Sequence, residues 1–356
     1  MKDLFLLDPG VVYLNHGSFG ACPRPVFERY QAWQRVLERE PVEFLARERG
    51  FGDLFEQARL RLAAYLGADP ANVVFTPNAT TGLNAAVRSL DLRPGDVVLM
   101  GDREYGGLLR LWEFVARRTG ARIERVPFEE LDPGPGTRVV FCSHVEWTSG
   151  RVNDVAELCR RARKAGAVSI VDGAHAPGQI ELDLEAIGAD VYGGNCHKWM
   201  CAPKGSGFLY ARPELHGLID PTVVSWDWED GAPFADVHRW QGTRDPSGFL
   251  AVPEAIDFQD AHDWPAVRAR CHRLLERARE RLPLEPLTDR FVQMLGFRID
   301  HPDAGELTRR LYADHRVEVP VFESAGGWVL RVSAQAYNDD EDIDVLAEAL
   351  ASVGVR

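Results

Sequence analysis

Several sequence features are missing from this chain of 356 residues, and each absence excludes a class of protein. No apolar run approaches the roughly 18 residues of a membrane helix, and Asp8 interrupts the apolar start before it reaches the length of a secretory signal. The six cysteines form no CxxC pair, and no group of His and Cys has the spacing of a zinc site. We therefore expect a cytoplasmic protein with reduced thiols and no metal site.

Positive charge, and lysine in particular, is scarce. Lysine and arginine together number 41 against 54 aspartates and glutamates, so the formal net charge is −13. This acidic balance argues against a nucleic-acid partner and against docking on an anionic membrane. The four lysines are Lys2, Lys164, Lys198 and Lys204. If the chemistry requires an amine nucleophile, the candidates are few.

The glycine motifs of three common enzyme classes are also absent. No GxGxxG opens a βαβ unit, no GxxxxGK[ST] occurs, and no GxSxG is found. These absences disfavour a nicotinamide-dependent oxidoreductase of the Rossmann type, a P-loop enzyme and an α/β-hydrolase.

Short apolar runs alternate with helical patterns between residues 73 and 172. The expected strands are Val73–Phe75, Val97–Met100, Arg138–Phe141 and Val168–Val171. One helix between them is expected to begin after Asp154, as its N-cap, and to end at Gly166. Near-continuous apolar strands separated by helices predict a mainly parallel sheet that is covered on both faces. Ligands of such sheets bind beyond the carboxyl ends of the strands.

The pattern changes near residue 256, where strands and helices of a compact α+β unit are expected. The expected segments are Leu274–Arg281, Phe291–Ile299, Ala304–Tyr312, Val317–Phe322, Trp328–Val332 and Asp342–Ala351. We therefore predict an N-terminal arm over residues 1–25, a large domain over 26–255 and a small C-terminal domain over 256–356.

Two strand ends carry the strongest chemical signal. Asp172 ends an expected buried strand, and Lys198 follows it within Asn195–Trp199. An aspartate in that position often does no more than cap a helix. Lys198, however, has cysteine, histidine, tryptophan and methionine as neighbours, which is not the pattern of a solvated face. A buried lysine is costly unless its pKa falls, and an amine with a lowered pKa is suited to Schiff-base chemistry.

These segments resemble class-V aminotransferase-fold enzymes that use pyridoxal 5′-phosphate (PLP), and most of all the isopenicillin N epimerase-like branch. The motifs that carry the resemblance are Leu14–Gly20, Val171–His175, Asp190–Trp199 and Gln241–Ser247. With Leu330–Asn338 the resemblance extends from residue 13 to about residue 345. It implies the α/β architecture of fold type I, like that of aspartate aminotransferase: a large domain with a mainly parallel sheet and a smaller C-terminal α+β domain.

The resemblance also implies a catalytic set. Lys198 would form the Schiff base with PLP and move the proton at the substrate Cα. Asp172 would pair with the pyridine nitrogen and keep it protonated, so that the ring acts as an electron sink. His175 would hydrogen-bond the phenolate oxygen; without the resemblance it would be interpreted as an ordinary core histidine.

Further positions would hold the cofactor and an amino-acid substrate. By resemblance, Tyr105 stacks on the pyridine ring, and the other PLP contacts come from Ala79, Thr80, Asn195, His197 and Thr243. Thr243 would reach the phosphate of a neighbouring subunit, which implies a homodimer with shared active sites. Arg331 would bind the α-carboxylate, with Asn15 and His16 of the arm near the substrate.

The reaction stays open among several classes that share the same PLP core. The resemblance favours an epimerase or racemase, but a C–S lyase that eliminates from a cysteine conjugate or sulfoxide and a class-V aminotransferase use the same Lys198 and Asp172. Epimerisation needs a second acid, for which His16 and Tyr105 are candidates. A desulfurase is disfavoured because Asp314–Pro320 has no cysteine. A PLP-fold protein that binds without turnover is disfavoured because the whole set is present.

Overall fold

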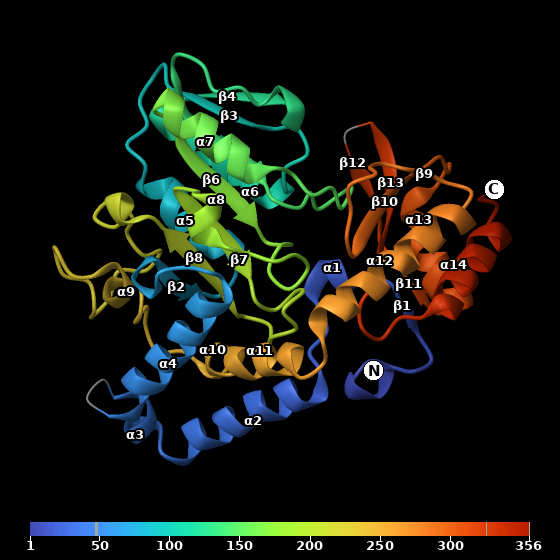
Figure 1. Cartoon of the computed structure of the whole chain (residues 1–356), viewed down its shortest axis with the longest axis horizontal. Coiled ribbons are helices and arrows are strands. Elements are labelled where there is room, and N and C mark those ends of the chain that lie inside the picture. The colour runs from blue at the N-terminus through green and yellow to red at the C-terminus, as the bar shows by residue number, and fades with distance from the viewer. Residues whose placement is uncertain (47–48, 325, 356) are drawn as a thin grey trace.

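A seven-stranded sheet lies at the centre of the larger part of the molecule (Figure 1). The computed structural model describes residues 1–46, 49–324 and 326–355. The strands are β2 Val73–Thr76, β3 Val97–Gly101, β4 Arg122–Val126, β5 Thr137–Ser143, β6 Val168–Gly173, β7 Val191–Asn195 and β8 Gly207–Ala211. Their order is β2-β8-β7-β6-β5-β3-β4, and β8 runs antiparallel to both neighbours while the other pairs are parallel. The prediction of a mainly parallel sheet is confirmed.

Both faces of this sheet are covered by helices. Along β5, Val139 and Phe141 belong to one apolar cluster, whereas Val140 and Cys142 belong to the other. The helices are α4 Gly50–Tyr65, α5 Ala79–Ser89, α6 Gly106–Thr119 and α7 Val155–Ala165. Buried side chains of α5 and α6 join the first cluster, and those of α4 and α7 join the second. A strand with two buried faces has no polar alternation, which is why these strands appear as continuous apolar runs.

Two aspartates mark where helices begin. The Asp154 carboxylate accepts a backbone N–H from the first turn of α7, which confirms the predicted cap. Asp263 caps α12 (Trp264–Arg281) in the same way. This helix begins well before the expected segment Leu274–Arg281, because Pro265 in its first turn favours a helix start.

A four-stranded antiparallel sheet with the order β12-β13-β10-β9 forms the C-terminal part of the molecule. Its elements are β9 Glu285–Pro286, β10 Met294–Ile299, α13 Ala304–His315, β12 Val321–Ser324, β13 Gly327–Ser333 and α14 Asp340–Ser352. The expected strand Val317–Phe322 is divided in the structure into β11 (Val317–Glu318) and β12. Pro320 lies between them and has no N–H to continue the ladder.

The N-terminal segment runs alongside this C-terminal part. Strand β1 (Val12–Tyr13) pairs in parallel with β11, and α1 (His16–Phe19) follows it. The chain continues through α2 (Arg24–Arg39), which packs against α10 (Ser247–Leu250) and α11 (Val252–Asp260) of the larger part. The N-terminal segment up to the end of α2 therefore touches both parts of the molecule. The domain limits at residues 25 and 255 stay a prediction.

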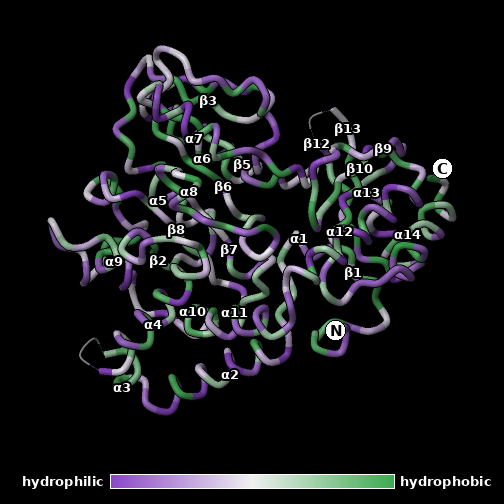
Figure 2. The backbone as a smooth tube through the Cα atoms, viewed as in Figure 1, coloured by the Kyte–Doolittle hydropathy of each residue, from purple (hydrophilic) through white to green (hydrophobic). Residues whose placement is uncertain are grey.

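The remaining elements connect these layers. They are η1 Lys2–Leu4, α3 Pro41–Leu45, η2 Pro70–Asn72, η3 Phe128–Glu130, α8 Leu184–Ile187, η4 Pro213–Leu215 and α9 Phe234–Val237. Apolar stretches follow the inner strands, and hydrophilic stretches are common on the outer helices and loops (Figure 2). Within the described ranges, no helix combines the length and the apolar character needed to cross a bilayer.

Candidate active site

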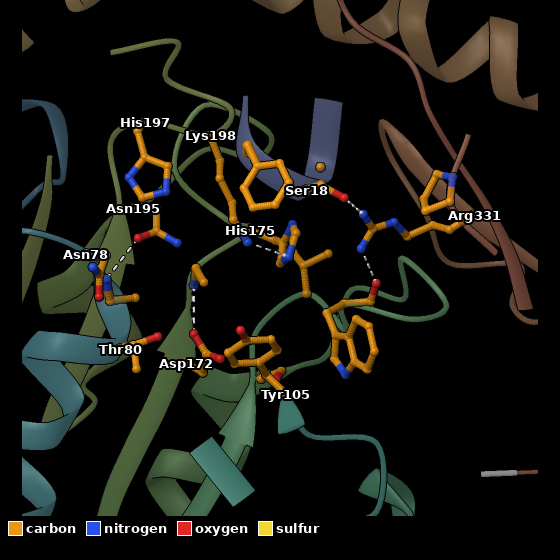
Figure 3. A pocket seen from close by; sticks show the side chains of 18 of the residues that line it. Ser18, Asn78, Thr80, Tyr105, Asp172, His175, Asn195, His197, Lys198 and Arg331 are labelled. Carbon is orange, nitrogen blue, oxygen red and sulfur yellow. Dashed lines mark hydrogen bonds between the residues drawn. The ribbon is translucent and has the colours of Figure 1, made fainter. Parts of the chain in front are cut away.

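A cavity of about 410 Å³ lies where β5, β6 and β7 end, between the two sheets (Figure 3). Its wall includes the start of α5, part of α1 and residues of β12 and β13. Nine of the predicted site residues line it, namely Ala79, Thr80, Tyr105, Asp172, His175, Asn195, His197, Lys198 and Arg331. The position agrees with the rule that parallel sheets bind ligands beyond their carboxyl ends.

Lys198 carries the amine of this cavity. Its Nζ lies 3.0 Å from Nε2 of His175 (Figure 3). Burial, helped by the positive charge of Arg331, lowers the pKa of Lys198 to about 7, while the charge of Asp172 acts in the opposite direction. An amine with this pKa is partly unprotonated at neutral pH and can act as a nucleophile.

Asp172 places a carboxylate at the floor of the cavity, near the end of β6. Its Oδ1 accepts the backbone N–H of Ala174 at 2.9 Å. The residue is only 4% exposed, and burial raises the pKa of its carboxyl. Burial penalises the ionised form of this carboxyl unless a positive charge lies beside it. A cationic group in the cavity next to Asp172 would therefore be favoured.

The N-terminus of α5 forms part of the cavity wall. The Asn78 side chain caps the helix by accepting the N–H of Thr81 at 2.8 Å. The N–H of Ala79 donates to Oδ1 of Asn195 at 2.8 Å, and Thr80 lines the cavity. His197 lies beside this wall, and burial lowers its pKa to about 4, so its ring is neutral. Such a helix start favours an anion.

Arg331 enters the cavity from β13 of the C-terminal sheet. Its Nη1 donates to the carbonyl oxygen of Trp147 at 2.7 Å, and its Nη2 donates to Oγ of Ser18 at 2.9 Å. Burial lowers the pKa of the guanidinium to about 10, so it stays charged at neutral pH. The strand of Arg331, the loop of Trp147 and helix α1 therefore fix this cation together. The sequence does not identify Ser18 as one of its partners.

Aromatic rings form one side of the cavity. Tyr105 is 44% exposed and meets Trp147 edge to face, with the ring centroids 6.0 Å apart. The Trp147 ring stacks on Phe322 of β12 at 4.7 Å. A Cβ at Gly107 would lie 2.6 Å from the Tyr105 ring, so only glycine at that position leaves room for the ring as it lies.

Three predicted site residues lie outside the cavity wall. Asn15 is behind Arg331, with its Oδ1 3.5 Å from Nη2 of that arginine. His16 is enclosed below Lys198 and contacts its carbonyl oxygen. Thr243 lines a different surface hollow, together with Trp226 and Trp240.

Comparison with known proteins decides the family. The model of the family described as Aminotransferase class-V matches residues 23–294. The chain belongs to the aminotransferase class-V family. This class-V enzyme is 40% identical to an isopenicillin N epimerase of Streptomyces clavuligerus, over 97% of this chain and 95% of the relative. It is 29% identical to a putative L-cysteine desulfhydrase of Oryza sativa subsp. japonica, over 96% and 83% of the two chains.

Solved structures agree with the class-V fold. A complex of the cystine C–S lyase C-DES with its product cysteine persulfide has a TM-score of 0.84 and 25% identity, and covers 96% of this chain and 98% of the other. The cysteine desulfurase CsdA of Escherichia coli has the same TM-score at 21% identity, with 99% and 96% covered. These likenesses confirm the fold type I architecture of this class-V enzyme.

PLP is the cofactor of this class-V enzyme, and the groups of the cavity fit it. An amine with a pKa near 7 suits an aldehyde, a buried carboxylate suits a protonated ring nitrogen, and a capped helix start suits a phosphate. All three groups open into one cavity.

Proposed function

We propose that this enzyme is a PLP-dependent epimerase or racemase that inverts the α-carbon of an amino acid. The observation that carries the proposal is the 40% and 38% identity to two isopenicillin N epimerases, each over 97% of the chain. The buried guanidinium opposite a reactive amine supports an α-amino acid as the substrate.

We assign the PLP-binding roles as follows. Bound PLP supplies an electron sink that acidifies the Cα–H of an attached amino acid. Lys198 would hold the cofactor through Nζ, and its amine, once released by the amino group of the substrate, would accept and return the Cα proton. The ionised Asp172 would hold the proton of the ring nitrogen, and His175 would donate to the phenolate oxygen. Tyr105 would cover the ring, and the phosphate would be bound by Ala79 and Thr80 at the start of α5 together with Asn195 and His197.

Arg331 orients the substrate in this proposal. Its fork binds the α-carboxylate in two parallel hydrogen bonds. Ser18 and the carbonyl of Trp147 take up other N–H groups of the guanidinium and prevent it from turning away. Asn15 acts from behind through its contact with the same guanidinium. The Cα–H is thereby presented to Lys198 in a fixed direction, which is what proton transfer requires.

We also propose that the enzyme is a homodimer with shared active sites. Thr243 lies away from the cavity of its own subunit, in a hollow beside Trp226, whose large ring is 84% exposed. Val223, Val224 and Trp228 in the same segment are also exposed, and an exposed apolar patch favours burial against a partner. Mixing a Lys198→Ala subunit with a Thr243→Ala subunit should restore PLP retention, because one site of each mixed dimer then holds both native residues. Failure to restore it, or an active monomer, contradicts the shared site.

A C–S lyase that performs β-elimination is the second candidate. Relatives described as L-cysteine desulfhydrases cover 96% of the chain, and a solved cystine C–S lyase shares the fold at 25% identity. Elimination needs a single base, which Lys198 provides. Epimerisation also needs an acid on the second face of the carbanion.

The deciding experiment exposes the holoenzyme to a panel of L-amino acids, cysteine conjugates and their sulfoxides in D₂O. Mass spectrometry and chiral chromatography follow Cα deuterium and the D-isomer, and a second assay measures pyruvate and ammonia. Deuterated D-isomer supports the epimerase. Pyruvate from a Cβ-substituted substrate without a D-isomer makes the enzyme a lyase, and amino-group transfer to a keto acid makes it an aminotransferase. Lys198→Ala should abolish every product.

A further inference from the structure

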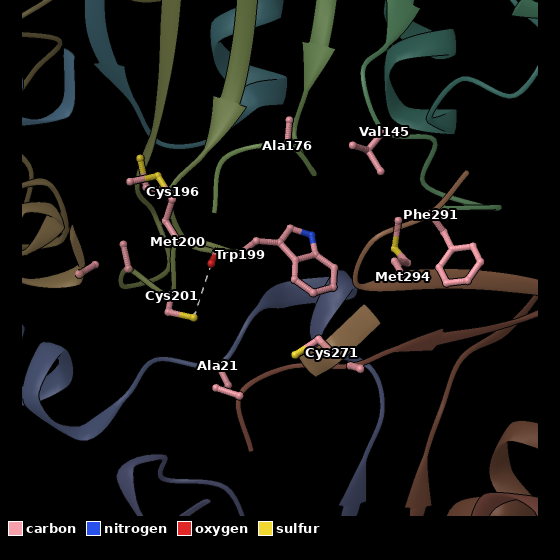
Figure 4. Close-up of a cluster of buried hydrophobic side chains, with 14 of the residues drawn as sticks. Ala21, Val145, Ala176, Cys196, Trp199, Met200, Cys201, Cys271, Phe291 and Met294 are labelled. Carbon is pink, nitrogen blue, oxygen red and sulfur yellow. Dashed lines mark hydrogen bonds between the residues drawn. The ribbon is translucent and has the colours of Figure 1, made fainter. Parts of the chain in front are cut away.

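Trp199 follows Lys198 in the chain, but its ring turns away from the cavity into the core. The side chain is fully buried, and Figure 4 shows it among buried residues that include Ala176, Cys271 and Met294. Its indole Nε1 lies 3.2 Å from Nδ1 of His175. The other ring nitrogen of His175, Nε2, lies 3.0 Å from Nζ of Lys198. One imidazole thus connects the indole to the amine.

The donors and acceptors in this chain of contacts fix the proton on His175. An indole N–H can only donate, so Nδ1 of His175 must accept. Burial lowers the pKa of His175 well below its usual value, so the ring is neutral. A neutral imidazole with an accepting Nδ1 carries its single proton on Nε2. That N–H is aimed at the amine of Lys198.

The direction of this N–H distinguishes the two states of the amine. An ammonium group has three donors and no acceptor, so an N–H aimed at it makes no hydrogen bond. A neutral amine has a lone pair that accepts the N–H. Hydrogen bonding to one protonation state shifts the equilibrium toward that state.

We propose that Trp199 is a positioning residue that sets the reactive state of Lys198: its indole N–H holds His175 in the Nε2–H tautomer, and this tautomer selects the neutral amine. The inference deepens the proposed function, since it rests on Lys198 as the PLP-binding lysine and supplies a cause for its reactivity.

Other charged and titratable groups also face the amine, and the test must separate them. Asp172 of β6 favours the ammonium, and Arg331 of β13 disfavours it. His197 and His16, on the adjoining segments, are neutral because burial lowers their pKa values to about 4 and about 3. All four remain in a Trp199→Phe variant. In that variant His175 is free to take the other tautomer, whose Nε2 accepts from the ammonium.

The experiment measures the reactivity of the Lys198 amine in the apoenzyme. Competitive labelling with acetic anhydride over a range of pH, with peptide mass spectrometry, gives the midpoint of its titration. We expect a midpoint near 7 in the native protein and an increase of about one unit or more in Trp199→Phe. Trp264→Phe is the matched control, because that buried indole donates to the carbonyl of Gly178 instead. Equal midpoints in the native protein and Trp199→Phe overturn the proposal.

A second measurement needs no tryptophan variant. Nitrogen NMR of native apoenzyme with labelled histidine reports the tautomer of each ring, and loss of one signal in His175→Gln assigns it. The Nε2–H pattern supports the proposal, and the Nδ1–H pattern overturns it even if Trp199→Phe does not fold. PLP attachment to another lysine, or a lack of Cα exchange, would overturn the proposed function without changing this tautomer or this midpoint, so the two can fail separately.

Discussion

The imidazole of His16 donates a hydrogen bond from Nε2 to the carbonyl oxygen of Lys198, 3.0 Å away. Since a carbonyl only accepts, the proton of this ring lies on Nε2. Its Nδ1 therefore accepts from the hydroxyl of Tyr337 at 3.0 Å, and burial keeps the ring neutral by lowering its pKa to about 3. One buried side chain of the N-terminal segment thus links the loop of the reactive lysine to the C-terminal part of the molecule.

We expect His16→Phe to destabilise this junction. The substitution keeps an aromatic ring of similar size but leaves the buried Tyr337 hydroxyl without its partner, at about 1–3 kcal/mol. It also removes one of the two hydrogen bonds to the Lys198 carbonyl oxygen, which keeps the N–H of Cys201. Urea denaturation should show a loss in the free energy of unfolding of that order. Tyr337→Phe is the control, because it removes one of the two bonds and should cost less. A variant as stable as the native protein would contradict the assigned hydrogen bonds.

The charge of Arg331 and its shape can be separated by two substitutions. Arg331→Gln removes both, so amino-acid binding should weaken by about 1.5–3 kcal/mol, and the pKa of Lys198 should rise because a cation is lost. Arg331→Lys keeps the cation but not the fork. It should weaken binding while leaving the pKa of Lys198 low.

Two titrations check this separation: amino-acid binding to the holoenzyme and the labelling midpoint of Lys198 in the apoenzyme. A glutamine variant with native affinity would show that Arg331 does not bind the carboxylate. An unchanged midpoint in that variant would show that its charge does not act on Lys198.

Glu104 is a buried acid behind the cavity wall, and it should make stability depend on pH. Its carboxyl contacts Oγ of Ser143 at 2.5 Å and the N–H of the same residue at 3.1 Å. Burial, reinforced by the charge of Asp172, raises its pKa from 4.5 to about 8. Between these values the folded state keeps a proton that the unfolded state releases. The free energy of unfolding therefore falls as pH rises through this window.

Glu104→Gln imitates the protonated side chain and should lose this dependence. Each unit of pKa shift corresponds to about 1.4 kcal/mol, so the native protein should lose a few kcal/mol more than the variant on going from weakly acidic to alkaline pH. Urea denaturation of both proteins at several pH values measures the difference. Glu113→Gln, on the exposed face of α6, is the control. Parallel pH profiles for the native protein and Glu104→Gln would rule out a buried proton on Glu104.

The sequence could predict the central strands but not the whole sheet. Strands with two buried faces are continuous apolar runs, and most of these are predicted. Strand β4 was missed because Arg122, Glu124 and Arg125 are exposed at the sheet edge, so it lacks such a run. Strand β8 is not predicted although all five of its residues are buried, because it begins at Gly207, directly after a glycine-containing segment that favours a loop.

The site was predicted to the extent that its residues lie in short motifs. The motif residues Asp172, His175 and Lys198 do line one cavity. The partners that orient them could not be predicted, because a contact such as that between Ser18 and Arg331 joins residues on α1 and β13 that only tertiary packing brings together. The same holds for His16, which the motif places near the substrate but whose two nitrogens are engaged beneath Lys198.

Tyr105 is therefore the better candidate for the second acid of an epimerase, since it lines the cavity and His16 is enclosed. Tyr105→Phe keeps the ring and its edge-to-face contact with Trp147 but removes the hydroxyl. If Lys198 serves one face of Cα and Tyr105 the other, the variant should still exchange the Cα proton of the L-amino acid in D₂O. Formation of the D-isomer should fall by about 100-fold or more, in the range of general acid catalysis. An equal loss of exchange and inversion would show that the hydroxyl is not the second acid, and native inversion would assign that role to another residue.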